Sequence, residues 1–156
     1  MNNRLPKIIS YIAPTLVVAM FFIIDRYLKQ IAISLPSQQS YSIIGNFFNF
    51  YFTPNNYIAF SIPLSGHFLN YIIIILICFL VIYLIASIKK GASRYELVGL
   101  ALMILGAISN IVDRFSHGFV VDYLLLRYFT VFNLADVMIC LGAIILIYKN
   151  LNKPKQ

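Results

Sequence analysis

The chain has 156 residues, of which 61% are hydrophobic and 11% charged, and its formal net charge is +7. A water-soluble domain carries about a quarter charged residues, so this composition excludes an ordinary soluble domain and indicates a membrane protein. The positive charge alone would also fit a nucleic-acid-binding protein. The basic residues lie beside long apolar blocks, however, and this placement argues against nucleic acid as a partner.

Four apolar blocks follow one another along the chain, at residues 8–24, 68–88, 97–112 and 132–148. A helix needs about 20 apolar residues to cross a hydrocarbon core that is about 30 Å thick. The second block is long enough, and the third and fourth reach this length if their polar ends lie at the membrane boundary. We therefore expect a single domain, residues 1–156, with the fold of an all-α polytopic membrane protein that has four transmembrane helices.

Basic residues set the expected topology. Eight of the twelve fall on one side of the membrane if the chain crosses four times. Short basic loops stay in the cytoplasm, so both termini are expected there, with outer loops at residues 32–67 and 115–131. The first block runs directly into Asp25 and Lys29 rather than into a small-residue cleavage site, so we expect a retained helix rather than a cleaved signal peptide.

The first outer loop has the composition of a strand. Ser40 to Thr53 is rich in aromatic and β-branched residues, which favours an extended backbone. Pro54 is expected to end this strand, and Tyr57 to Ile62 to form a second, shorter one. We expect a small sheet, or cradle, on the outer membrane surface. The aromatic residues would equally fit a simple interfacial belt, and composition leaves both interpretations open.

Four of the five acidic residues fall at the outer ends of the blocks or in the outer loop between the third and fourth blocks. These four are Asp25, Asp113, Asp122 and Asp136, whereas Glu96 lies beside a cytoplasmic loop. Carboxylates close to hydrocarbon are costly and are usually paired or functional. Their convergence at one depth predicts a polar site at the outer membrane boundary.

Two of these acids have neighbouring partners. Asp25 and Lys29 are four residues apart, which predicts a salt bridge at the end of a helix. Asn110, Asp113 and Arg114 occupy one polar face of the third block. The adjacent Arg114 is expected to keep Asp113 ionised, so we interpret Asp113 as a scaffold residue that orients other groups.

The other two acids suggest chemistry. Asn133 and Asp136 have the spacing of a helix capping box, and Asp122 has no basic residue within four positions. Two carboxylates that meet share one proton. The ionised member can activate a water against a peptide carbonyl while the protonated member donates to the carbonyl oxygen, as in aspartic proteases. This chemistry needs no metal or cofactor, and the isolated Cys78 and Cys140 suggest neither a disulfide nor a metal site.

The polar segments resemble the motifs of the lipoprotein signal peptidase family, also called signal peptidase II. Five segments match in chain order: Asp25–Lys29 resembles Asp-x-x-x-Lys, Asn55–Phe60 resembles Asn-x-Gly-x-Ala-Phe, Gly106–Arg114 resembles Gly-Ala-x-x-Asn-x-x-Asp-Arg, Gly118–Tyr123 resembles Gly-x-Val-Val-Asp-Phe, and Phe132–Asp136 resembles Phe-Asn-x-Ala-Asp. One such motif is weak evidence, but five in order across nearly the whole chain are highly specific.

This resemblance implies an aspartic endopeptidase that cleaves diacylglyceryl-modified prolipoproteins just before the lipidated cysteine. The catalytic pair that it implies is Asp122 and Asp136. The residues that it implies for substrate binding or support of the site are Asp25, Lys29, Asn55, Asn110, Asp113, Arg114 and Asn133. The resemblance also implies four helices with a small periplasmic sheet, in the bacterial inner membrane, with the active site at the outer face. We expect a monomer that contacts membrane lipids and uses no cofactor.

Two departures from the family pattern bear on the substrate. Tyr57 stands where the family has glycine, close to Asn55, and tyrosine does not easily admit the close backbone approach that glycine allows. Thirteen residues separate Asp122 from Asp136, which predicts a short and more open second outer loop.

Two other functions are weighed against the protease. A catalytically degenerate homologue that acts as a membrane scaffold is favoured by Tyr57. A small proton- or cation-coupled transporter subunit would place its acids at mid-membrane depth, whereas here they lie at the boundary. Activity that survives the substitution Asp122→Asn would favour the scaffold.

Overall fold

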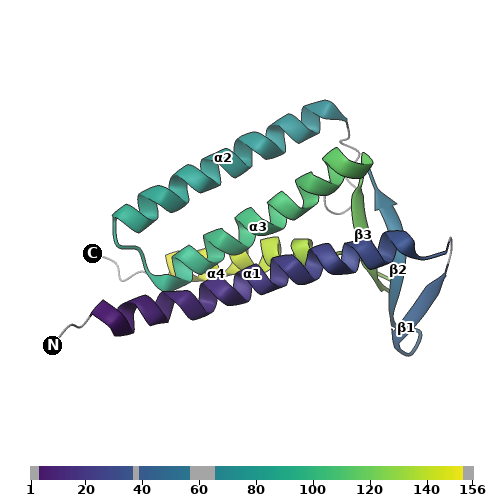
Figure 1. Cartoon of the computed structure of the whole chain (residues 1–156), viewed down its shortest axis with the longest axis horizontal. Helices are drawn as coiled ribbons and strands as arrows, with labels where there is room; N and C mark the ends of the chain where they lie inside the picture. Colours follow the sequence, from purple (N-terminus) through teal and green to yellow (C-terminus); the bar gives the residue numbers. More distant parts are fainter. Residues whose placement is uncertain (1–3, 37–38, 57–65, 153–156) are drawn as a thin grey trace.

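A computed structural model describes residues 4–36, 39–56 and 66–152, and of residues 4–12 and 67 it describes only the backbone. Within these ranges the helices are α1 (Arg4–Ser34), α2 (His67–Lys89), α3 (Arg94–His117) and α4 (Leu134–Leu151). The helices run side by side along the long axis of the molecule, and a small sheet closes one end (Figure 1). The start of α1 and the end of α4 lie at the opposite end.

Each predicted apolar block forms a helix, and two of these helices continue well beyond the predicted end. α1 runs through the polar segment at Asp25 to Ser34, and α3 runs through Asp113 to His117. The apolar pattern stops earlier than the helix because the polar side chains in these turns are paired inside the protein. In the part of the chain that the structure describes, α2, α3 and α4 are long and apolar enough to cross a membrane, which covers three of the four expected spans.

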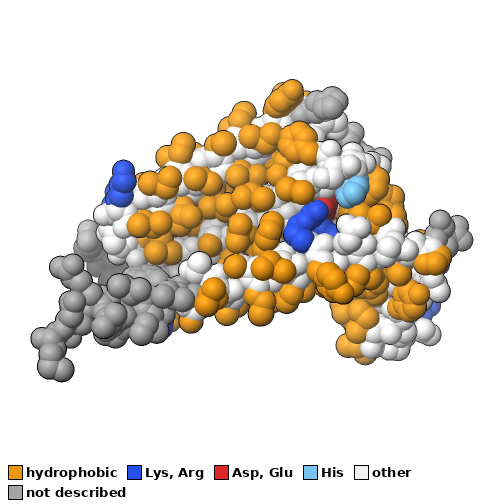
Figure 2. Space-filling model, viewed as in Figure 1, with side chains coloured by type: hydrophobic (Ala, Val, Ile, Leu, Met, Phe, Trp, Pro, Cys, Tyr) orange, Lys and Arg blue, Asp and Glu red, His pale blue; other side chains and the backbone are white. Residues whose placement is uncertain are grey.

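α3 is the central helix of the bundle. It packs against α1, α2 and α4, and half of its apolar stretch (50%) is buried, compared with 6% for α2. Side chains of α2 such as Ile75, Phe79 and Ile82 are exposed. Figure 2 shows a face that is apolar along most of the helices, with basic side chains beside an acidic one toward the end that carries the sheet and a further basic group at the opposite end. This distribution fits a protein whose flanks face lipid.

Glycines bring α3 and α4 into backbone contact. A Cβ on Gly142 would lie 2.5 Å from the carbonyl oxygen of Gly99, and one on Gly106 would lie 2.6 Å from that of Ala135. No other residue fits at these distances. Small residues at a helix interface are the usual means of close packing inside a membrane, where lipid tails are as apolar as leucine. We call this contact, formed by Gly99, Gly106 and Gly142, the glycine seam.

In the part of the chain that the structure describes, the sheet has four antiparallel strands in the order β1 (Ser40–Ile44), β2 (Phe48–Asn55), β3 (Val120–Leu126) and β4 (Thr130–Phe132). The single strand predicted over residues 40–53 is therefore a hairpin. Gly45, with a positive φ of 50°, lies in the turn, a conformation that glycine adopts without strain. The second outer segment, expected as a loop, supplies half of the sheet.

β2 pairs with β3, and this pairing joins the two segments that were predicted as outer loops. Pro54 does not end the strand as predicted. It lies opposite Val121, and β2 continues to Asn55. The register also places Thr53 opposite Asp122. The second strand that we predicted from Tyr57 onward lies outside the described residues.

Two apolar clusters hold these parts together. One is formed by Val18, Leu102 and Met138, and it joins α1, α3 and α4. The other, formed by Ala32, Val121 and Tyr123, joins the last turns of α1 to β3. The second cluster fixes the sheet on the end of the helix bundle and therefore fixes the position of Asp122, which lies between two of its members in sequence.

Candidate active site

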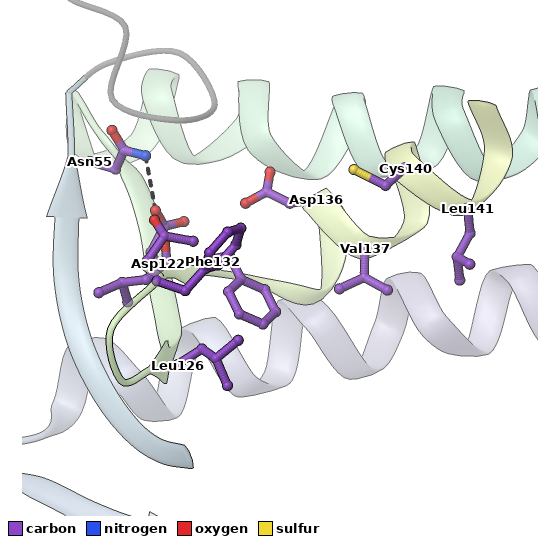
Figure 3. A pocket seen from close by; sticks show the side chains of 11 residues that line it. Asn55, Asp122, Leu126, Phe132, Asp136, Val137, Cys140 and Leu141 are labelled. Carbon is purple, nitrogen blue, oxygen red and sulfur yellow. Dashed lines mark hydrogen bonds between the residues drawn. The ribbon is translucent and has the colours of Figure 1, made fainter. Parts of the chain in front are cut away.

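A cavity of about 380 Å³ opens where the sheet meets the first turns of α4. Three residues with a carboxyl or amide side chain line it: Asn55 from β2, Asp122 from β3 and Asp136 from α4. Figure 3 shows Asn55 and Asp122 pointing toward one another, with Asp136 directed toward the same space. The rest of the lining is largely apolar and consists of Leu126, Phe129, Thr130, Val131, Phe132, Val137, Cys140 and Leu141. The two predicted catalytic carboxylates thus line one cavity.

Asp122 is 2% exposed and accepts hydrogen bonds from two asparagine amides. The Nδ2 atom of Asn55 donates to Oδ2 of Asp122 at 2.9 Å, and Nδ2 of Asn133 donates to Oδ1 at 2.6 Å. Burial, and then the negative charge of Asp136, raise the pKa of Asp122 to about 7. The two amide bonds and the charge of Lys29 oppose this rise. A carboxyl group with this pKa holds its proton for much of the time near neutral pH.

Asp136 occupies the third position of α4, and the predicted capping box is confirmed. Its backbone N–H donates to Oδ1 of Asn133 at 2.9 Å, and its Oδ2 accepts from the backbone N–H of Asn133 at 3.3 Å. Its Oδ1 also accepts from Nδ2 of Asn110 at 2.8 Å. These donors and the positive end of the helix dipole favour a negative charge at this position. The capping role and the cavity-lining role are therefore compatible.

Asn133 contacts both carboxylate residues. Its side chain is fully buried, its Nδ2 atom bonds Asp122 and the carbonyl oxygen of Val121, and its Oδ1 atom bonds the N–H of Asp136. Both donor hydrogens of the amide and one of its acceptor sites are used, which leaves a single orientation for the group. This one side chain therefore fixes β3 against the start of α4.

A buried ion cluster lies behind the cavity. Lys29 is 1% exposed, and its Nζ atom lies 3.1 Å from Oδ2 of Asp25 and 2.7 Å from Oδ2 of Asp113. The predicted pair of Asp25 and Lys29 is thus confirmed. Arg26 also forms an ion pair with Asp113. Asp113 therefore forms ion pairs with two residues of α1, in addition to the expected electrostatic interaction with the neighbouring Arg114.

The ion cluster reaches the cavity through two contacts. Nζ of Lys29 donates to Oδ1 of Asn110 at 2.8 Å, and Asn110 in turn donates to Asp136. Oδ2 of Asp113 accepts from the backbone N–H of Val121 at 3.2 Å, next to Asp122. Asp113 therefore orients β3, in agreement with its interpretation as a scaffold residue.

Arg114 lies in a different hollow from the two aspartates. It lines a cavity of about 260 Å³ together with Asn56, Leu69, Asn70 and Gly118. Its charge still interacts with those of Asp136, Asp122 and Asp113. The structure therefore gathers eight of the nine predicted site residues around the carboxylates, and it places Arg114 beside them.

Three residues of the site were missed by the sequence analysis. Arg26 pairs with Asp113, Ser109 donates from Oγ to Oδ2 of Asp25 at 2.5 Å, and the hydroxyl of Tyr123 donates to Oδ1 of Asp25 at 2.9 Å. Ser109 was detectable because it lies four residues before Asp113 on the same helix. Tyr123 was detectable because it follows Asp122 on a strand and so faces the core, where a phenol needs a partner.

Comparisons with known proteins find a family model, related sequences and a solved structure that match this chain. A family model described as signal peptidase (SPase) II matches residues 17–152. A lipoprotein signal peptidase of Clostridium novyi is 32% identical over 137 residues, with 84% of this chain and 92% of the relative covered. One of Clostridium tetani is 34% identical, with 85% and 88% covered. A solved structure of a bacterial membrane enzyme superimposes with a TM-score of 0.77 at 28% identity, over 92% of this chain and 93% of the other.

Proposed function

The chain belongs to the signal peptidase II family, and on this premise we propose that it removes the signal peptide from prolipoproteins with Asp122 and Asp136 as its catalytic pair. The observation that carries the proposal is that both carboxylates line one largely apolar cavity. Such a pair can cleave a peptide bond with one water and without a side-chain nucleophile, as aspartic proteases do.

The two carboxylates would have different roles. The raised pKa of Asp122 suits a general acid that protonates the carbonyl oxygen of the scissile peptide bond. Asp136 accepts hydrogen bonds from Asn110 and from the N–H of Asn133 at a helix N-terminus, so it suits the ionised base that takes a proton from the attacking water. The protons belong to the pair, so its two apparent pKa values are shared.

The apolar lining of the cavity supports a lipid-bearing substrate. Leu126 of β3, Phe132 of β4 and Leu141 of α4 form a hydrophobic wall beside the carboxylates. An acyl chain next to the scissile bond would lie against this wall, and its apolar surface would be buried away from water. The substrate that fits this arrangement is a prolipoprotein with diacylglycerol on the cysteine that follows the cleaved bond.

The proposed topology has four spans, with the sheet and the cavity at the outer face of the inner membrane and both termini in the cytoplasm. Lys89, Lys90, Arg94 and Lys149 lie at the helix ends far from the sheet, as the rule that basic loops remain cytoplasmic requires. α1 would be the fourth span, with its charged side chains Asp25, Arg26 and Lys29 at the outer boundary.

Cleavage of a diacylglyceryl-modified prolipoprotein in detergent tests the proposal. Purified wild type is expected to convert the substrate to the shorter product, as seen by a mobility shift on a gel. The variants Asp122→Asn and Asp136→Asn keep the shape of each side chain and are expected to lose this activity.

Glu96→Gln is the matched control, because it also removes one carboxylate charge but lies near the other end of α3. It is expected to cleave like the wild type. Wild-type activity that persists in both aspartate variants would exclude the proposed pair. A folded wild type without activity would favour the catalytically degenerate scaffold, and proton or cation flux in vesicles would favour the transporter.

A further inference from the structure

Tyr123 lies behind the proposed catalytic strand. Its side chain is fully buried, and its ring packs against Phe50 at a centroid distance of 5.4 Å. Successive side chains of a strand point to opposite faces, so Asp122 faces the cavity while Tyr123 faces the helix bundle. Burial raises the pKa of the Tyr123 phenol above its ordinary value, so the hydroxyl stays protonated and can act as donor and acceptor at the same time.

The hydroxyl of Tyr123 completes the N-terminus of α4. The first N–H groups of a helix have no partner within it and need one from elsewhere. The N–H of Leu134 donates to the Tyr123 hydroxyl at 3.1 Å, and the N–H of Ala135 donates to Oδ1 of Asp25 at 3.1 Å. The third N–H, that of Asp136, donates to Asn133. These donors are thus satisfied from β3, from α1 and from the capping residue.

The same hydroxyl connects the three segments. It donates to Oδ1 of Asp25, and the same Oδ1 atom also accepts from the N–H of Ala135. The Tyr123 hydroxyl of β3 and the Asp25 carboxylate of α1 therefore hold the first turn of α4 together. Asp122 is the neighbour of Tyr123 in β3, and Asp136 lies two residues after Leu134 in α4. A shift of this turn relative to β3 would therefore change the separation of the two carboxylates.

We propose that Tyr123 is a positioning residue of the active site, whose hydroxyl sets the distance between Asp122 and Asp136 by fixing the first turn of α4 to β3. The inference rests on the proposed function of the carboxylate pair. The position carries phenylalanine in the motif that this segment resembles, so in this chain the hydroxyl adds a bond that the ring alone does not provide. Asn133 makes the same connection on the cavity side, and Tyr123 makes it on the opposite side of the strand.

The variant Tyr123→Phe tests this role, because it keeps the ring and removes only the oxygen. A small misplacement of reacting groups is costly, so kcat is expected to fall about tenfold while KM changes little. Infrared titration of the carboxyl groups needs no substrate. It is expected to show the two apparent pKa values of the pair moving closer together, because carboxylates that lie farther apart repel each other less. Hydrogen exchange at the N–H of Leu134 is expected to accelerate.

Two control variants separate positioning from general loss of packing. Tyr83→Phe removes a hydroxyl that donates to the carboxylate of Glu96 at 3.3 Å, far from the cavity, and is expected to leave kcat and the titration unchanged. Phe50→Leu loosens the packing of the Tyr123 ring and keeps its hydroxyl. The inference is overturned if Tyr123→Phe leaves the titration of the pair unchanged. It is also overturned if Phe50→Leu lowers the melting temperature as much as Tyr123→Phe does and causes the same changes in kcat and in the titration. A wild type without cleavage would refute the proposed function, whereas the titration would still decide the role of Tyr123.

Discussion

Among the described residues, two clusters of polar side chains surround buried acids: an outer cluster beside the sheet and an inner cluster at the other end of the bundle. The inner cluster is centred on Glu96 of α3, which accepts hydrogen bonds from Ser87 at 2.9 Å and Tyr83 at 3.3 Å and forms an ion pair with Lys149. It joins α2, α3 and α4 with one acid and one base. Its charges are matched, and its groups already bond one another within the protein.

The outer cluster differs in how its acids are bonded. Asp25 and Asp113 form ion pairs with α1, much as Glu96 does with Lys149. Asp122 and Asp136 instead accept hydrogen bonds from asparagine amides, and both line a cavity. The comparison teaches that the ion-paired buried acids hold the helices together. Burial beside the cavity and the negative charge of Asp136 let Asp122 hold a proton near neutral pH, which is a requirement for acid–base chemistry.

Removal of the central lysine of the outer cluster is expected to have the largest effect. Lys29→Met leaves the buried Asp25 and Asp113 with less compensation, and the free energy of unfolding is expected to fall by about 3–5 kcal/mol. Lys149→Met is the matched change in the inner cluster, where the lysine side chain is 26% exposed and the loss is expected to be about 1 kcal/mol. Unfolding in detergent, followed by circular dichroism, measures both. Equal losses would contradict the distinction between the two clusters.

Removal of a neutral donor is expected to affect catalysis more than stability. Asn110→Ala deletes the bond from Nδ2 to Asp136, and a hydrogen bond to a charged group contributes about 1.5–3 kcal/mol, so kcat is expected to fall about 10- to 100-fold. Ser87→Ala deletes a donor to Glu96 in the inner cluster and is expected to leave kcat unchanged. Steady-state cleavage kinetics compare the two variants. A similar kcat in both would mean that Asn110 has only a structural role.

The pH dependence of cleavage sharpens the comparison further. Because the pKa of Asp122 is raised to about 7, its proton is present below that pH and lost above it. If Asp122 is the general acid, the rate is expected to fall about tenfold for each pH unit above this value. Glu96→Gln is expected to keep the same alkaline limb. A rate that stays constant up to pH 9 would exclude Asp122 as the acid.

The smallest expected effect concerns the cap of α3. Ser93 accepts a hydrogen bond from the N–H of Glu96 at 3.4 Å, and Ser93→Ala is expected to cost about 0.5–1 kcal/mol of stability without a change in kcat. Asn133→Ala removes a cap of the same kind from α4 but also releases Asp122, so it is expected to lower kcat as well. Thermal unfolding and kinetics on both variants test this, and unchanged kcat for Asn133→Ala would count against its bridging role.

The apolar blocks and the polar motifs predicted much of this arrangement. Four helices followed from the apolar blocks, and the capping box at Asn133 and the pairing of Asp25 with Lys29 followed from residue spacing. The small sheet was one of the two interpretations that composition left open. Contacts between distant segments could not be predicted in this way. The pairing of β2 with β3, which brings Asn55 to Asp122, depends on a register that neither strand encodes by itself. The partners of Asp113 were missed for the same reason, because they lie on another helix.

The glycine seam limits which substitutions the protein can tolerate. Every substitution of a glycine adds a Cβ, and at Gly106 and Gly142 that carbon would lie only 2.6 and 2.5 Å from a backbone oxygen. Val137 and Leu141 line the cavity, so another apolar side chain at either position would project into open space. We therefore expect substitutions in the cavity wall to be tolerated more readily than substitutions in the glycine seam, because only the latter would force α3 and α4 apart.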